Sequence, residues 1–124
     1  MLAAVRFGAL YVLCCTVLVI GAPNVNGTWT GTIDFRLPEG GLVSSHLFIQ
    51  FEQTGDAVFG TAGPSEHKQS QITNGKITGD IITFKVGPAG HVFEFALAPR
   101  GRELHGRAEA DDGTTAIVRL KRER

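Results

Sequence analysis

Four histidines are the side chains of this sequence best suited to metal or acid–base chemistry. His46, His67, His91 and His105 form no His-x-His or His-x-x-x-His pair, spacings that commonly bring two imidazoles to one ion. We therefore interpret them as separate surface or rim residues, and we predict neither a metal nor a cofactor. One pairing stays open, because His46 and His91 precede equivalent inward-facing runs and could meet at one rim of the fold.

Acidic side chains and hydroxyl groups show no catalytic arrangement either. Asp34, Glu52, Glu94 and Glu109 alternate with apolar residues, as expected of a solvated strand face rather than a pair of catalytic carboxylates. No serine lies in a nucleophile-elbow motif, and the glycine-rich segments do not lead into predicted helices as phosphate-binding loops do. The sequence therefore predicts that the protein is not an enzyme.

The charge balance gives no reason to expect nucleic acid as a partner. The 124 residues contain 12 Lys and Arg against 12 Asp and Glu, a formal net charge of zero. The tail Lys121–Arg124 is short and mixed in sign, so we interpret it as the solvated end of a strand.

The N-terminus has the pattern of a cleavable secretory signal peptide. Arg6 is followed by a run from Phe7 to Ile20 that is apolar except for two residues, and the run is shorter than the ~20 residues that span a bilayer. We predict a signal helix over residues 1–21, with cleavage after Gly21 and cleavage after Ala22 as the alternative. A linker over 22–26 and a β domain over 27–124 follow.

This leader determines the predicted compartment and the thiol chemistry. Cys14 and Cys15 both lie inside the apolar run, so cleavage leaves no cysteine and no disulfide. We predict an exported protein, periplasmic or extracellular, with no membrane span after cleavage.

The rest of the chain alternates apolar and polar residues with the period of a strand. Short turn sequences rich in Gly, Pro and Asp separate eight such segments, and short turns favour antiparallel pairing between neighbours. The prediction is an all-β, eight-stranded, antiparallel up-and-down barrel, with a β-sandwich as the alternative. The expected strands are Gly27–Arg36, Ser44–Gln53, Ala57–Ala62, Gln69–Lys76, Asp80–Val86, His91–Ala98, Glu103–Ala110 and Thr114–Lys121.

An internal repeat of 46 residues supports this arrangement and assigns the faces. The stretch from Leu47 to Ala62 has the same apolar and glycine pattern as the stretch from Phe93 to Ala108, which predicts two hairpins of one register. Gly31, Gly60 and Gly106 fall on inward positions, where they either let strands bend or leave room for a ligand. The residues expected to point inward are Leu47, Ile49, Phe51, Val58, Ile82, Phe84, Val86, Phe93, Phe95, Leu97 and Leu104.

The first strand opens with Gly27-Thr28-Trp29, which resembles the Gly-x-Trp signature of the calycins: lipocalins, fatty-acid-binding proteins and avidins. In that superfamily the Trp plugs one end of the barrel and a basic residue of the last strand packs across it. The resemblance implies that Gly27 and Trp29 are the signature residues here, that Trp29 is the plug, and that Arg122 is the basic residue that packs across it. The Gly-Thr-Trp-Thr-Gly opening and the pattern from Gln53 to Thr61 also resemble small exported bacterial domains of unassigned function.

The calycin resemblance implies a non-catalytic binding module that holds a small apolar ligand in the barrel or at its mouth. Phe51, Phe84, Phe93 and Phe95 are the expected ligand-binding residues, because aromatic walls supply much of the apolar contact area in such sites. The alternative is a solid-core barrel that engages a protein or cell-envelope partner through its outer surface. In that case the outward-facing Phe48 and Phe59 form the apolar pair to examine.

Overall fold

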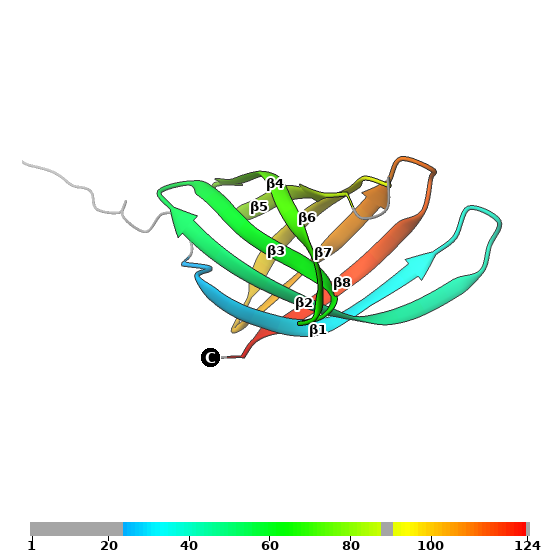
Figure 1. The fold of residues 1–124 in the computed structure, drawn as a ribbon, viewed down its shortest axis with the longest axis horizontal. Helices are drawn as coiled ribbons and strands as arrows, with labels where there is room; N and C mark the ends of the chain where they lie inside the picture. The colour runs from blue at the N-terminus through cyan, green and yellow to red at the C-terminus, as the bar shows by residue number, and fades with distance from the viewer. Residues whose placement is uncertain (1–23, 88–90, 124) are drawn as a thin grey trace, which may run out of the picture.

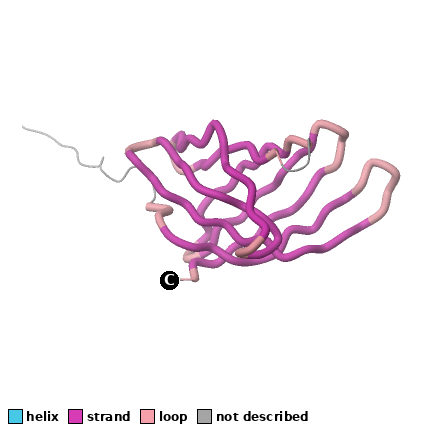
Figure 2. Tube along the Cα trace, in the orientation of Figure 1, coloured by secondary structure: helices cyan, strands magenta, loops and turns pink. Residues whose placement is uncertain are grey.

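The computed structural model describes residues 24–87 and 91–123, and in them the chain forms eight strands and no helix (Figure 1; Figure 2). All neighbours in sequence pair antiparallel, and β1 also pairs with β8, so the sheet closes into a barrel. The predicted up-and-down meander is confirmed, and closure excludes the two-sheet sandwich. The strands are β1 (Gly27–Arg36), β2 (Leu42–Thr54), β3 (Ala57–Ser65), β4 (Lys68–Thr78), β5 (Ile81–Val86), β6 (Phe93–Arg100), β7 (Glu103–Ala110) and β8 (Thr115–Arg122).

The expected signal helix over residues 1–21 lies outside the described residues. Among those described, no helix is long and apolar enough to span a membrane.

Strand ends follow the sequence prediction closely, with one instructive error. Gly63-Pro64-Ser65 was expected to be a turn, but β3 runs through it and the chain turns at Glu66 and His67. Gly63 still pairs with Phe48 of β2, and pairing with β2 stops there. Pro64 comes next, where the register of β3 against β4 shifts between Ala62 and Ser65, and proline is tolerated at such an irregularity.

The two repeated hairpins have the same register, as predicted. Phe51 lies opposite Gly60 in the first, and Leu97 lies opposite Gly106 in the second. A Cβ at either glycine would overlap a carbonyl oxygen of the facing strand. The glycines therefore allow close strand approach and bending, rather than leaving room for a ligand.

The interior is filled by the side chains that alternation assigned to it. Ten of the eleven predicted inward residues are buried, and Phe93 is half-buried against the core. Phe84 is stacked on Phe95 with ring centroids 4.8 Å apart and meets Phe51 edge-on at 5.5 Å. These rings form a packed layer across the barrel.

Trp29 seals one end of the barrel. Its ring is only 4% exposed, and its Nε1 donates a hydrogen bond to the carbonyl of Val25 at 2.9 Å. The guanidinium carbon of Arg122 lies 4.5 Å from the ring centroid, so the contact expected from the calycin resemblance is present. A cation–π contact of this kind contributes about 0.5–2 kcal/mol.

The segment just before β1 completes this closure. Arg122 donates hydrogen bonds to the carbonyls of Asn24 and Asn26, and the backbone N–H of Val25 donates to Gln53 Oε1 at 2.8 Å. Val25 is buried, so part of the segment expected to be a linker belongs to the core. We call this end of the barrel the sealed end. The opposite end, where turns join β1 to β2 and β7 to β8, is called the mouth.

Candidate functional site

An apolar cup of about 200 Å³ lies at the mouth. Its walls come from six strands, β1 to β6, and almost all of the surface that it exposes is carbon. Phe35 and Phe93 face each other across β1 and β6 with ring centroids 5.8 Å apart, and Phe95 lies deeper. The remaining lining residues are Ile33, Ser45, His46, Leu47, Ala62, Gly63, Pro64, Ser70 and Val86.

The four predicted ligand-binding phenylalanines divide between this cup and the core beneath it. Phe93 and Phe95 line the cup. Phe51 and Phe84 do not line it, since they lie in the packed layer on the sealed side of Phe95. Phe95 joins the two groups, because one face of its ring is stacked on Phe84.

One side of the cup opens between β2 and β3. β2 pairs with β3 only from Phe48 onwards, although its pairing with β1 extends back to Leu42. At the junction, the side-chain amide of Gln69 donates to the carbonyls of Phe48, at 3.2 Å, and Ser65, at 2.6 Å. Gln69 therefore bridges β2 and β3 where the two strands separate. Its own buried Oε1 has no hydrogen-bond partner among the described residues.

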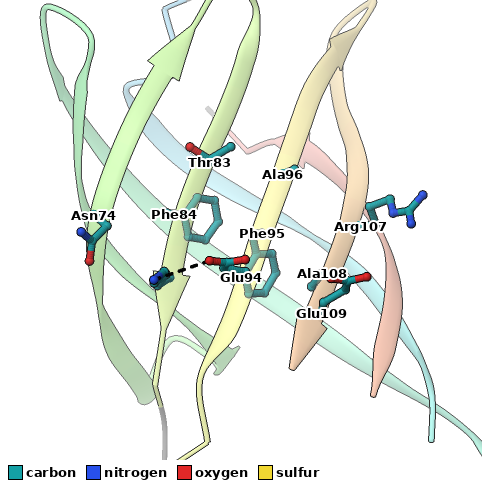
Figure 3. A pocket seen from close by; sticks show the side chains of 10 residues that line it. Asn74, Thr83, Phe84, Glu94, Phe95, Ala96, Arg107, Ala108 and Glu109 are labelled. Atoms are coloured by element: carbon teal, nitrogen blue, oxygen red, sulfur yellow. Dashed lines mark ion pairs between the residues drawn. The ribbon is translucent and has the colours of Figure 1, made fainter. Parts of the chain in front are cut away.

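A second, larger groove of about 370 Å³ crosses the outer face of β5, β6 and β7 (Figure 3). Its outward side chains are polar and of both signs, including Lys85 and Glu94, whose charged atoms lie 3.5 Å apart. An open surface of exposed charges, two of which already pair with each other, offers little to a ligand beyond weak screened contacts. The cup is the better candidate because its surface is concave and apolar.

The histidines do not converge on one site. His46 lines the cup from β2, whereas His91 Nδ1 lies 3.9 Å from Asp111 Oδ1, and both of those side chains are exposed. Among the described residues there is no group of three or more His, Cys, Asp or Glu that could hold a metal ion.

One close pair of titratable groups is not among the residues predicted from the sequence. His105 Nε2 lies 2.6 Å from Glu103 Oε1, and this hydrogen bond is the main reason that the pKa of Glu103 is lowered, with help from the charges of Lys121 and Arg119. Glu103-x-His105 is a spacing that puts both side chains on one face of a strand, so the signal was present. The pair lies on the outer face, away from the cup.

Comparison with known proteins returns no protein-family model, no curated protein and no solved structure that matches this chain. The closed, eight-stranded antiparallel barrel is consistent with a calycin-like fold. Its function is therefore inferred from the geometry of its mouth and of its surface.

Proposed function

We propose that this protein is an exported, non-catalytic binding module that takes one apolar group into the cup at the barrel mouth. The observation that carries the proposal is the cup itself, in which the half-buried rings of Phe35 and Phe93 present apolar surface and the buried Phe95 lies deeper. Burial of such surface against a ligand is favourable by about 25 cal/mol per Å².

The size of the cup restricts the ligand. An apolar cavity of about 150 Å³ is enough to bind benzene, whereas pockets for whole drug-sized ligands begin at about 300 Å³. At about 200 Å³ the cup accommodates one aromatic ring or one branched aliphatic group. The remainder of a larger ligand would lie outside the barrel, because the layer of Phe51, Phe84 and Phe95 fills the interior below.

The outer-surface alternative receives less support from the positions of Phe48 and Phe59. Phe59 is 52% exposed and lies opposite Glu52, whereas Phe48 is half-buried and lies opposite Gly63. Four residues of β2 separate the two places, which is about 13 Å along a strand. They do not form one apolar patch of the kind that marks a protein interface.

We also propose that the barrel is calycin-like and that the protein is exported. The Gly27, Trp29 and Arg122 arrangement at the sealed end supports a calycin-like barrel. The N-terminal sequence pattern supports export to the periplasm or the extracellular space.

Titration with indole, followed by NMR of the side-chain methyl groups, tests the cup. We expect saturable shifts at Ile33, Leu47 and Val86, which line it, and none at Leu104 near the sealed end. Phe93→Trp enlarges a ring at the rim and should weaken binding about tenfold, a cost of about 1.4 kcal/mol. Phe59→Trp adds the same ring to the outer face and should leave binding unchanged. Saturable shifts confined to the outer face, or none at all, would contradict the proposal.

A further inference from the structure

The first half of β2 has a free edge beside the cup. Residues Leu42–Leu47 pair with β1 on one side, but no described strand pairs with them on the other. Figure 1 shows the β1–β2 hairpin continuing past the turn that joins β3 to β4. The sheet closes into a barrel because β2 pairs with β3 from Phe48 onwards, yet the stretch before Phe48 is an edge strand.

The direction of the backbone groups follows from the Gln69 contact. The carbonyl of Phe48 points to the β3 side, since it accepts a hydrogen bond from Gln69 there. Backbone groups of alternate residues in a strand point to the same side, so the N–H and C=O groups of Leu42, Ser44 and His46 point to the free edge. Among the described residues, the one donor to the carbonyl of His46 is the adjacent Ser45 hydroxyl, at 3.0 Å.

Nothing in the sequence of this edge discourages pairing. From Gly40 to Phe51 there is no Pro, Asp, Glu, Lys or Arg, the residues that natural proteins place on exposed edges to prevent strand addition. Leu42 is 73% exposed and Val43 is 47% exposed, so apolar surface accompanies the free backbone groups.

The edge and the cup share residues. Ser45 and Leu47 lie on the inner face of this stretch and line the cup, while Gly63 and Pro64 of β3 form the other side of the opening. A strand added to β2 would lie about 4.8 Å from it. Every second side chain of that strand would then point to the cup.

We propose that the occupant of this site is a single extended peptide segment, which adds a strand to Leu42–Leu47 and inserts one bulky apolar side chain into the cup. This inference rests on the proposed function and specifies its ligand. Main-chain hydrogen bonds supply sequence-independent affinity and the cup supplies selectivity, as in other cases of strand addition. The uncharged edge suits a segment that is itself uncharged over five or six residues.

A single chain fits the opening better than a second copy of this barrel. β2 of a second copy has β1 along its other side, so it brings a two-stranded ribbon to an opening bordered by Gly63–Ser65. A free segment has no strand behind it and can lie between β2 and β3. A small apolar molecule, in turn, would leave the edge groups of Ser44 and His46 unused.

Selection of a phage-displayed library of random nine-residue peptides on the purified protein tests the proposal. Enriched peptides are synthesised and their affinities measured by calorimetry. Ser44→Pro removes one edge N–H without touching the β1 ladder, and should weaken binding about tenfold. Ser44→Ala is the matched control, because it loses the same hydrogen bond to Asp34 but keeps the N–H. Phe93→Trp should also weaken binding about tenfold, whereas Phe59→Trp should not.

Amide hydrogen exchange gives a direct readout of strand addition. The bound peptide should slow exchange at Leu42, Ser44 and His46, whereas Val43, Ser45 and Leu47 already face β1 and should change little. Uniform slowing across all six residues, or slowing confined to the outer face of β5 to β7, would overturn the proposal.

The outcomes separate this inference from the function on which it rests. If no peptide binds the wild-type protein better than the Ser44→Pro variant but indole binds in the cup, the peptide inference fails and the proposed binding module stands. If neither binds, both fail. If sedimentation shows a wild-type dimer that Ser44→Pro converts to a monomer, a second copy occupies the edge and the peptide inference is overturned.

Discussion

The two ends of this barrel are built from similar strands but are finished in opposite ways. At the sealed end, Trp29 is covered by Arg122 and by the segment that contains Val25. At the mouth, Phe35 and Phe93 also face each other, but no described segment covers them. The comparison shows that closing the sheet does not by itself close the barrel, because each end needs its own plug.

The difference has a physical origin in strand length. Near Trp29, β2 is paired with β1 on one side and with β3 on the other. Near Phe35, β2 continues for six residues beyond its last partner in β3, so the wall opens on one side. We interpret the sealed end as the stabilising end and the mouth as the end available for binding.

Replacement of the aromatic residue at each end is the strongest test of this comparison. Trp29→Ala should destabilise the fold by about 3–5 kcal/mol, since it removes a large side chain that is only 4% exposed. Phe93→Ala should cost about 1–2 kcal/mol, because the ring is half-buried and water can fill the space it leaves. Urea unfolding midpoints measure both. Equal losses at the two ends would contradict the proposed division.

Much of the fold could be predicted from the sequence because alternation reports directly on faces. The buried residues of β2, β5 and β6 were all identified, as was Leu104 of β7, and the 46-residue repeat gave the register of two hairpins. The glycine pattern needed three-dimensional information, since only the facing carbonyls show that Gly60 and Gly106 serve close approach.

The opening at the mouth could not be predicted, because the sequence of β2 does not show where its pairing with β3 begins. From Leu42 to Phe51 there is no Gly, Pro, Asp, Glu, Lys or Arg, so no turn residue or charge in that strand marks the point where β3 leaves. The position depends on where β3 turns, and Gly63-Pro64-Ser65 suggested a turn too early. Which of the inward phenylalanines line a cup was therefore undetermined, and Phe51 and Phe84 could not be distinguished from Phe93 and Phe95.

A smaller effect is expected from Arg122, the lid of the sealed end. Arg122→Ala removes the cation–π contact and the hydrogen bonds to Asn24 and Asn26, and should cost about 1–2 kcal/mol. Arg122→Lys retains the charge but not the planar fork that reaches two carbonyls, so it should recover only part of the loss. Thermal unfolding with Arg119→Ala as an exposed control measures this. Full recovery by lysine would mean that charge alone closes this end.

The smallest expected effects concern the pKa of one carboxyl group near each end of the barrel. The pKa of Glu103, near the sealed end, is lowered below its ordinary value of 4.5 mainly by the hydrogen bond to His105. The pKa of Asp112, near the mouth, is lowered below 3.8 mainly by the backbone N–H of Thr114, which lies 2.9 Å from its Oδ1. Because both pKa values are lowered in the folded state, each contribution to stability is present above the ordinary pKa and is lost as the pH falls through the folded value.

Carboxyl-carbon NMR titration should therefore give midpoints below 4.5 for Glu103 and below 3.8 for Asp112. His105→Ala should return the midpoint of Glu103 towards 4.5 and leave that of Asp112 unchanged, since its main partner is backbone. Thr114→Val should remove only the hydroxyl contribution at Asp112, because the backbone N–H remains. If His105→Ala shifted both midpoints, the two ends would be electrostatically coupled, and the description of the barrel as two independently finished ends would be wrong.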